Sequence, residues 1–399
     1  MTPKERFKKI CSFELPDDFF TFGLFCWNET YDRWISEGMP VKNMENVKEV
    51  NMHFVGHDGQ NEILPPNGAI MGLGKNLNPP WAPPLDPLFE VEVLEDHGTN
   101  VILRDADGSI VERKKGDFES MPKWVSYPVT DKESWDEYKK RLDPHTPGRF
   151  PDGWEIMTDD KMMWPIRPEH VNRGWEERDF PIGMFLYSLF GMPRSHLGLE
   201  EFSYTLVDNP KLIEEMMDWH TYLAEELLKK VFAAGITLEW VWVWEDIACN
   251  TGALIPPKYV KEHMHRYRRV TDLLHSNGVD AIIVDSDGNV DELLPLWMDS
   301  GINATYPLER AAGMDAEKLR KKYGKDLIMF GNIDKRNLSK GKKEIDGELQ
   351  KVKRLMKGSG YFPGCDHHVP PDVSYENIKY LFNGLYAMND DPKMRRVIR

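Results

Sequence analysis

The feature that most constrains the fold is a regular alternation of strand-like and helix-like segments through the second half of the chain. Short apolar runs at residues 182–190, 236–244 and 279–284 are separated by longer segments with helical periodicity, such as residues 210–234 and 257–277. Strands that alternate with helices form parallel sheets, and at least six such units favour a closed (β/α)8 barrel of the TIM type. The predicted fold class is therefore α/β, with an open doubly wound sheet as the alternative.

Residues 51–180 interrupt this alternation, and we interpret them as an insertion into a single barrel domain that spans residues 1–399. The stretch FEVEVLEDHGTNVILRDADGSIVERKK alternates apolar and polar residues, and its Asp107-Gly108 pair is a strong signal for a hairpin turn. A short helix and a loop rich in Pro, Gly and Trp follow. The insertion is thus predicted to contain antiparallel strands and Pro/Trp-rich loops.

Composition and charge exclude several classes of protein. A formal net charge of -15, without a concentrated cluster of Lys and Arg, disfavours a nucleic-acid partner. No apolar run approaches the ~20 residues of a membrane span, and the N-terminus lacks the apolar core of a signal peptide. Four dispersed cysteines suit a reducing compartment. We expect a cytoplasmic protein without a membrane partner, and the sequence leaves open whether it forms a homo-oligomer.

Polar residues follow the ends of five successive predicted strands. In chain order these residues are Glu245 and Asp246, Asp285 and Asp287, Tyr306 and Glu309, Asn332 and Asp334, and Cys365, Asp366, His367 and His368. The C-terminal ends of barrel strands share one mouth, so we expect these side chains to form a functional cleft there. Each residue taken alone also has a structural interpretation, because a single Asp can cap a helix or a turn.

The donor types in this set predict a metal. Carboxylate, thiolate and imidazole together suit Zn2+ better than Mg2+ or Ca2+. Our candidate zinc ligands are a subset of Asp285, Asp287, Glu309, Cys365 and His367. The candidate catalytic residues are Asp287, Glu245 and Glu309, and their action as general acid and base without a metal stays open.

Aromatic residues at the strand ends suggest a flat ligand. Trp240, Trp242 and Trp244 share one face of a predicted strand, and we expect these rings to pack between the sheet and the outer helices. Trp244, at the strand end, could still reach the mouth. Trp244 and Tyr306 are therefore the candidate residues for packing a substrate ring, with Asn332 or Glu245 orienting its polar substituents.

Several segments resemble the uroporphyrinogen decarboxylase superfamily. They are TPKERFKKI, WEDIACNTGALIPPKYVKEH, GNIDKRNL and PGCDHHVPPDVSYENI, and the resemblance covers most of residues 1–30 and 180–390. It implies a (β/α)8 barrel with the active site at the C-terminal mouth. In the decarboxylases of this superfamily an arginine-rich segment near the N-terminus holds the carboxylates of the tetrapyrrole. The matching region here, TFGLFCWNETYDRW, contains only Arg33, which disfavours a polyanionic tetrapyrrole substrate.

The resemblance is closer to the corrinoid-dependent methyltransferases of the superfamily. In the zinc enzymes of that branch a His-x-Cys-Gly-Asn/Asp stretch and a later Gly-Cys supply three metal ligands. The matching residues here are Asp285-Ser286-Asp287-Gly288-Asn289 and Gly364-Cys365. Carboxylates in place of the His and Cys make a bound metal a stronger Lewis acid, which favours activation of an oxygen substituent over thiol methylation.

The resemblance thus implies the first methyltransferase of an O-demethylase system. Such an enzyme moves a methyl group from a methoxylated, typically aromatic, substrate to the cob(I)alamin of a partner corrinoid protein, with zinc as Lewis acid. The cobalamin is expected on the partner, because this chain contains no DxHxxG-type lower-ligand motif. Two alternatives stay open: a decarboxylase-like lyase for a smaller carboxylated substrate, which would need an arginine such as Arg167 or Arg194 in the mouth, and a methylamine- or thiol-type corrinoid methyltransferase.

Overall fold

The computed structural model describes residues 1–16, 26–39, 69–70, 85–115, 121–147, 181–233, 235 and 237–390. The Pro/Trp-rich loop from residue 148 onward and Arg167 lie outside these ranges. Within them, no helix is long and apolar enough to cross a membrane.

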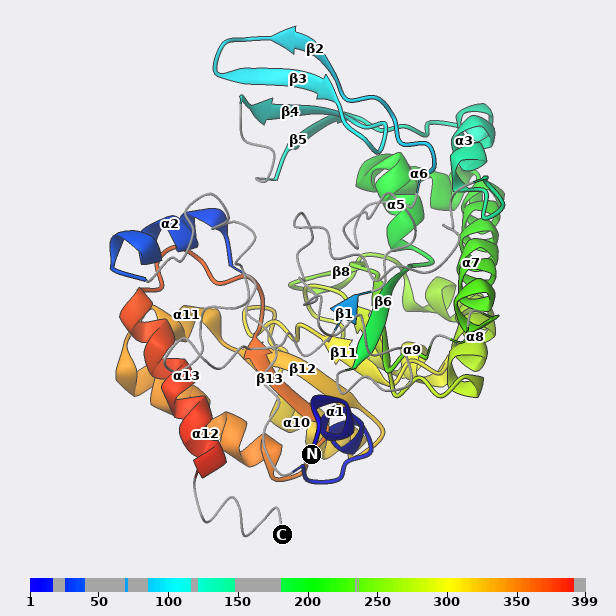
Figure 1. Cartoon of the computed structure of the whole chain (residues 1–399). Coiled ribbons are helices and arrows are strands. Elements are labelled where there is room, and N and C mark those ends of the chain that lie inside the picture. The colour runs from blue at the N-terminus through cyan, green and yellow to red at the C-terminus, as the bar shows by residue number, and fades with distance from the viewer. Residues whose placement is uncertain are drawn as a thin grey trace.

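The centre of the fold is a parallel sheet of seven strands (Figure 1). Its spatial order is β1 (Ala69–Ile70), β6 (Ile182–Tyr187), β7 (Trp240–Trp244), β10 (Ala281–Asp285), β11 (Ala304–Tyr306), β12 (Ile328–Ile333) and β13 (Tyr361–Cys365). Every neighbouring pair is parallel. The expected α/β architecture is therefore confirmed. In the described part of the chain β1 and β13 are the outer strands of the sheet, so a closed eight-stranded barrel is not seen there.

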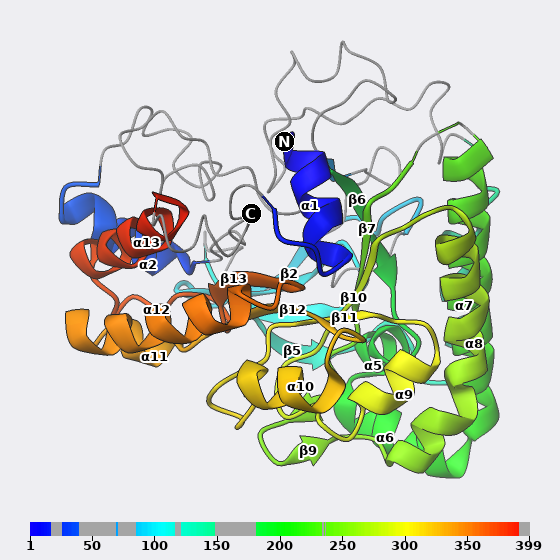
Figure 2. The same ribbon diagram turned by 90° about the horizontal axis from the view of Figure 1, so that it is seen from below.

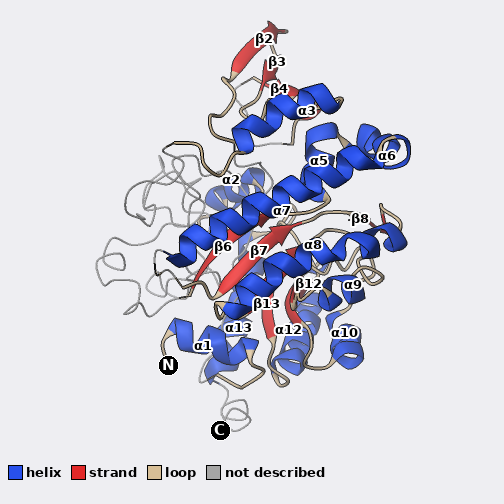
Figure 3. Ribbon diagram, turned by 90° about the vertical axis from the view of Figure 1, so that its right-hand side faces the viewer, coloured by secondary structure: helices blue, strands red, loops and turns tan. Residues whose placement is uncertain are grey.

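Helices follow the strands and cover one face of the sheet. They are α5 (Gly191–Leu197), α6 (Leu199–Asp208), α7 (Pro210–Ala233), α8 (Pro257–Ser276), α9 (Leu294–Asp299), α10 (Ala316–Tyr323), α11 (Lys335–Leu338), α12 (Lys342–Met356) and α13 (Tyr375–Asp390). The long pair α7 and α8 lies side by side (Figure 3). Helix α7 buries an apolar row that includes Ile213, Met217 and Leu227, as its periodicity predicts. The apolar cluster between helices and sheet is the main core.

The opposite face of the sheet is filled by a second cluster, closed at one end by helix α1 (Pro3–Cys11). Figure 2 shows α1 inside the arc of the outer helices. This inner cluster consists of Phe7, Ile10, Trp240, Trp242, Ala281, Ile283, Ala304, Tyr306, Ile328, Phe330 and Phe362. The expectation that the tryptophan face of β7 packs against the outer helices is wrong for Trp240 and Trp242. Strand alternation turns Val241 and Val243 toward the helices instead.

Glycine makes room for one of these rings. Gly183 on β6 is the register partner of Trp240 on β7. A Cβ at Gly183 would lie 1.8 Å from the Trp240 ring. The large indole therefore fits the inner face only because its neighbour has no side chain.

A separate antiparallel sheet lies apart from the parallel one (Figure 3). Its strands are β2 (Glu92–Asp96), β3 (Asn100–Arg104), β4 (Ile110–Lys114) and β5 (Lys123–Ser126), in that order. The turn between β3 and β4 contains Gly108 at φ +88°, in agreement with the predicted Asp-Gly hairpin. Val101, Leu103 and Val111 form its small buried cluster, and α3 (Lys132–Tyr138) then returns the chain toward α7.

Several short elements were not predicted from the sequence. They are α2 (Asn28–Ser36), α5, α6, α11 and the hairpin of β8 (Ala248–Cys249) with β9 (Gly252–Ala253). Apart from α2, each follows a strand of the parallel sheet at its C-terminal end. These elements surround the edge at which the predicted site residues gather.

Candidate active site

Asp285 lies at the C-terminal edge of the parallel sheet. It is the last residue of β10, and alternation along the strand turns it to the same face as Ala281 and Ile283. The indole Nε1 of Trp242 donates a 2.9 Å hydrogen bond to its Oδ2. Burial raises the pKa of Asp285 well above its ordinary value, and the charges of Asp287 and Asp246 raise it further. The protonated form of Asp285 is therefore favoured relative to that of an exposed aspartate.

The Tyr306 ring forms the wall beside Asp285. Tyr306 is buried at the end of β11, with its ring centroid 4.9 Å from that of Trp242. Burial, together with the charges of Asp285 and Asp287, raises the pKa of its hydroxyl well above the ordinary range. The phenol therefore stays neutral and can donate a hydrogen bond at this edge.

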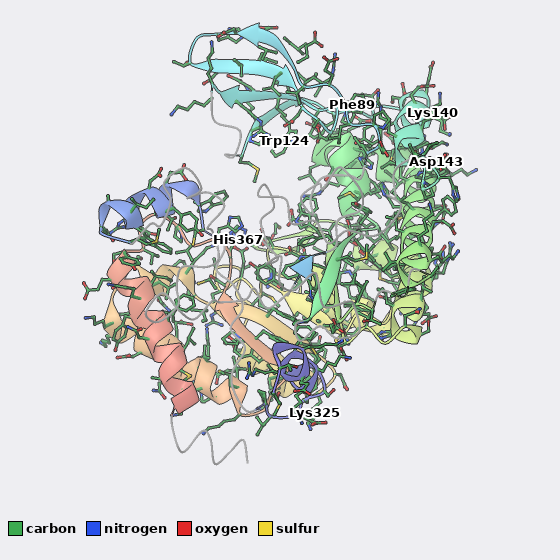
Figure 4. The ribbon with its side chains drawn as sticks, in the orientation of Figure 1. Phe89, Trp124, Lys140, Asp143, Lys325 and His367 are labelled. Carbon is green, nitrogen blue, oxygen red and sulfur yellow. The ribbon has the colours of Figure 1, made fainter. Side chains whose placement is uncertain are left out.

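Asp287 and His367 form a pair that solvent reaches. His367 Nε2 lies 3.2 Å from Asp287 Oδ2, and the two side chains are 26% and 42% exposed. Burial by itself would raise the pKa of Asp287, but the hydrogen bond and charge of His367, with Lys335 and His368, lower it below the ordinary value. Figure 4 shows His367 on the side of the parallel sheet that faces the antiparallel sheet. The predicted partners are thus together, as an acid–imidazole pair.

Glu309 joins this group through a lysine that sequence reasoning missed. Its Oε2 accepts a hydrogen bond from the Gly288 backbone N–H at 3.1 Å, and its Oε1 lies 3.4 Å from Lys335 Nζ. Lys335 is in the GNIDKRNL segment, one residue beyond Asp334 at the end of β12, and a lysine among the acids of the strand ends was the signal that could have identified it. We define the edge cluster as Asp285, Asp287, Glu309, Lys335 and His367.

A second group flanks the edge cluster. Trp244 ends β7, and the guanidinium carbon of Arg194 lies 5.0 Å from its ring centroid. Arg194 also donates to Asp246 Oδ2 at 3.1 Å. Burial raises the pKa of Asp246, while Arg194 acts in the opposite direction. Trp244 therefore reaches the C-terminal edge, where one face of its ring is near a cation.

Three predicted site residues have buried structural contacts instead. Glu245 points toward the helices, where it accepts hydrogen bonds from the backbone of Phe190 and Gly191 and from the Tyr267 hydroxyl. Asn332, at φ +67°, binds the backbone of Leu308, Met314 and Ala316. Cys365 lies in the cluster on the helix side of β13 and is 3% exposed. Burial raises the pKa of its thiol well above the ordinary value.

The predicted zinc ligands do not converge as a ligand set. Among the described residues, no group of three or more His, Cys, Asp or Glu side chains could hold a metal ion. Asp285 is bonded to Trp242, Asp287 to His367 and Glu309 to Lys335, while Cys365 packs on the opposite face. The donors present therefore do not fit a zinc ion in this arrangement.

The chain is similar in sequence to several known proteins. Two curated uroporphyrinogen decarboxylases are similar to the chain. That of Helicobacter acinonychis (strain Sheeba) is 28% identical over 124 residues, which cover 31% of this chain and 32% of the relative. That of Campylobacter curvus (strain 525.92) is 22% identical over 192 residues, which cover 47% of this chain and 52% of the relative. The chain thus matches between about a third and a half of the length of these relatives.

A solved structure matches over nearly the whole chain. It is a methyltransferase from Methanosarcina mazei, with a TM-score of 0.58, 15% identity, and coverage of 97% of this chain and 99% of the other. At this identity the match supports the fold. The sequence profile described as uroporphyrinogen decarboxylase (URO-D) matches residues 176–387, which is more than half of the chain and includes the entire edge cluster. On this match, the chain belongs to the uroporphyrinogen decarboxylase family.

Proposed function

We propose that this protein is a methyltransferase that moves a methyl group from a methoxylated, typically aromatic, small molecule to the reduced corrinoid of a partner protein. Membership of the URO-D family and a fold shared with a methyltransferase support an enzyme of this kind. The observation that carries the proposal is the edge cluster, in which carboxylates, an ammonium and an imidazole are joined through Asp285 to the Trp242–Tyr306 ring pair. Such a site can receive a flat ring and stabilise charge on an oxygen attached to it.

The contacts of Arg33 argue against a tetrapyrrole substrate. This arginine, on α2, donates to Glu37 Oε1 and to the Pro371 carbonyl, both at 2.7 Å. Its guanidinium is thus already hydrogen-bonded to the residue that follows α2 and to the loop that follows β13. A substrate with several carboxylates would need guanidinium groups that are free to receive them.

Asp285 and Tyr306 are the groups in this chain suited to the leaving oxygen. Breaking the methyl–oxygen bond leaves the electron pair on oxygen, which then needs a proton or a positive charge. A carboxyl whose pKa is raised by burial can supply that proton, and the Tyr306 phenol can donate a hydrogen bond. The raised pKa values of both groups agree with these roles.

The test is methyl transfer from a panel of methoxybenzenes, methoxybenzoates, methylamines and methyl thioethers. The purified protein is mixed with a corrinoid protein in the Co(I) state, and formation of the methyl–cobalt species is followed by absorbance. We expect transfer from methoxylated aromatics in the wild type, and a strongly reduced rate in Asp285→Asn. A matched control is Asp291→Asn, because Asp291 pairs with Lys322 on the exposed surface. Failure of every donor would refute methyl transfer, and transfer from amines or thioethers alone would favour the other corrinoid branch.

The guanidinium of Arg194 is the observation that favours the lyase alternative. Its Nε is buried and has no acceptor among the described residues, although its Nη1 donates to Asp246. A substrate carboxylate could take up that donor after a small side-chain movement. This alternative predicts release of CO2 from small aromatic carboxylates without any corrinoid, and loss of that release in Arg194→Met.

Three further features remain proposals derived from the sequence. We expect the parallel sheet to close into an eight-stranded barrel, which an experimental structure of the full chain would test. We expect a cytoplasmic location, which fractionation of the source cells would test. Zinc binding stays a prediction of the sequence alone, tested by elemental analysis of the wild type against Asp287→Ala and Cys365→Ala, and no step proposed here passes through it.

A further inference from the structure

Lys335 lies among the residues from which the sequence predicts a metal site. It is the first residue of α11, which follows β12 and the N-cap Asp334, and its backbone N–H donates to Asp366 Oδ1 at 2.9 Å. That bond ties the lysine to the end of β13, because Asp366 follows Cys365 directly. The other oxygen of Asp366 accepts from the Arg310 backbone N–H at 2.8 Å. One carboxylate therefore fixes the backbone of Lys335 relative to two neighbouring strand ends.

The ammonium of Lys335 reaches the carboxylates of the neighbouring strands. Its Nζ lies 3.4 Å from Glu309 Oε1, and its side chain is 19% exposed. Its charge also acts on Asp287, Cys365, Asp366 and His368. The Glu309 carboxylate thus lies beside an ammonium whose charge also acts on Asp287 and that can still be reached from solvent.

We propose that Lys335 supplies the positive charge that stabilises the leaving oxygen of the substrate, in the place that the family resemblance gives to a zinc ion. The inference rests on the proposed methyl transfer for its reaction, and on the contacts of Lys335 for its geometry. Lys335 lies beside the Glu309 carboxylate, and its charge also lowers the pKa of Asp287, so both acids have a cation nearby within the chain. Glu309, one of the predicted zinc ligands, is then a partner of this lysine.

In the reaction the electrons balance as follows. The Co(I) of the partner's corrinoid donates the electron pair of the new cobalt–carbon bond and becomes Co(III). The methyl carbon–oxygen bond breaks, and its electron pair stays on the oxygen as a phenoxide. The ammonium of Lys335 donates a hydrogen bond to this oxygen, and the phenoxide takes the proton of the Asp285 carboxyl before it leaves, which solvent then replaces on Asp285.

A lysine is chemically suited to this position. Its ammonium has three N–H donors, and Glu309 is the acceptor that it contacts among the described residues. Donors remain for an incoming oxygen. A preorganised donor of this kind typically contributes ~10²–10³-fold to the rate when charge develops on oxygen.

The first test compares Lys335→Met, Lys335→Arg and the control Lys322→Met. Lys322 pairs with Asp291 on the exposed surface and is outside the edge cluster. We expect Lys335→Met to lower kcat/KM by ~10²–10³-fold, with partial rescue in Lys335→Arg and no change in Lys322→Met. The loss should grow as the leaving phenol becomes less acidic, because a poorer leaving group carries more charge in the transition state. Equal loss for all leaving groups would assign Lys335 a purely structural role and overturn the inference.

The second test does not depend on turnover. The wild type should bind 4-nitrophenol as the coloured phenolate, which lowers the apparent pKa of the bound probe, whereas Lys335→Met should bind it as the neutral phenol. Identical spectra for both proteins would overturn the inference, even if methyl transfer itself is established. If no donor is ever demethylated, the proposed reaction fails, but the probe still decides whether Lys335 is an anion-binding cation. Stoichiometric zinc that is lost in Asp287→Ala and Cys365→Ala would also overturn the inference.

Discussion

Asp280 lies at the end of the parallel sheet opposite the active site, where it carries a charge that the fold disfavours. It precedes β10, and its buried Oδ2 has no hydrogen-bond partner among the described residues. Burial raises the pKa of Asp280 to about 6, with Glu239 acting in the same direction and Lys8 and Lys4 against it. We predict that Asp280→Asn stabilises the protein at neutral pH.

The magnitude follows from the difference between the two pKa values. An exposed aspartate titrates near ~3.9, and the difference from about 6 corresponds to ~3 kcal/mol of unfolding free energy. Below the lower value both states are protonated, so the residue has no effect. As the pH rises, the unfolded chain ionises first, and the wild type loses stability until the folded carboxyl has also ionised. The full cost is therefore present above pH ~7 and vanishes below pH ~4.

The nearby Lys8 predicts the opposite effect, because an ion pair would stabilise the charged form of Asp280. The distance between the two groups shows which effect is larger. Lys8 Nζ is 3.9 Å from Asp280 Oδ2, and the lysine side chain is 45% exposed. Exposed pairs of this kind contribute ~0–1 kcal/mol, which is less than the cost of burial. The pKa of about 6 already includes the opposing charge of Lys8, so we expect a net gain of ~2–3 kcal/mol for Asp280→Asn at pH 8.

Urea unfolding of both proteins at pH 4, 6 and 8 measures this difference directly. The stability of the variant relative to the wild type should increase steadily across the series. The control is Lys8→Met, which removes the opposing charge and should destabilise the protein at pH 8 by less than ~1 kcal/mol. A variant that is less stable than the wild type at pH 8 would show that the Lys8 pair dominates and would refute the reasoning.

Three further predictions concern positions around the C-terminal edge. Gly288→Ala should destabilise by ~1–3 kcal/mol more than Gly313→Ala in urea unfolding. Both glycines have positive φ, but a Cβ at Gly288 would lie 2.7 Å from the Cys249 carbonyl, whereas Gly313 has open space. Asn332→Ala should cost ~2–4 kcal/mol, because it removes three buried hydrogen bonds at a positive φ; a loss below 1 kcal/mol would contradict this account. Trp242→Phe should raise the pKa of Asp285 still further, because the hydrogen bond from the indole favours the charged carboxylate. Infrared titration of the carboxyl band measures this pKa, and an unchanged value in the variant would contradict the role of the bond.

Local patterns in the sequence predicted most elements of the parallel sheet. The periodicity of residues 210–234 placed α7 within one residue, and apolar runs located β6, β7, β10, β12 and β13. These predictions succeed because helix and strand periodicities are properties of short segments. The short helices α5, α6 and α11 were not predicted, because short elements carry too little periodicity to be recognised in the sequence.

Strand order explains which site residues were predicted together. Asp285, Asp287, Glu309 and His367 all follow strands that end at one edge of a parallel sheet, so residue type and position sufficed to group them. Sequence reasoning did not decide the direction of each side chain. Glu245 and Cys365 are one residue out of phase with the inner face, and a shift of one residue turns a strand side chain to the opposite side.

The sequence by itself therefore determined the α/β class, the family and the edge of the sheet at which chemistry is expected. The tertiary structure alone decided the partners of each polar group. It paired Asp287 with His367 and Glu309 with Lys335, and it turned Cys365 toward the helices. The physical reason is that a side chain's charge and donor type are encoded locally, whereas its neighbours come from strands far away in the sequence, so their identity emerges only when the sheet forms.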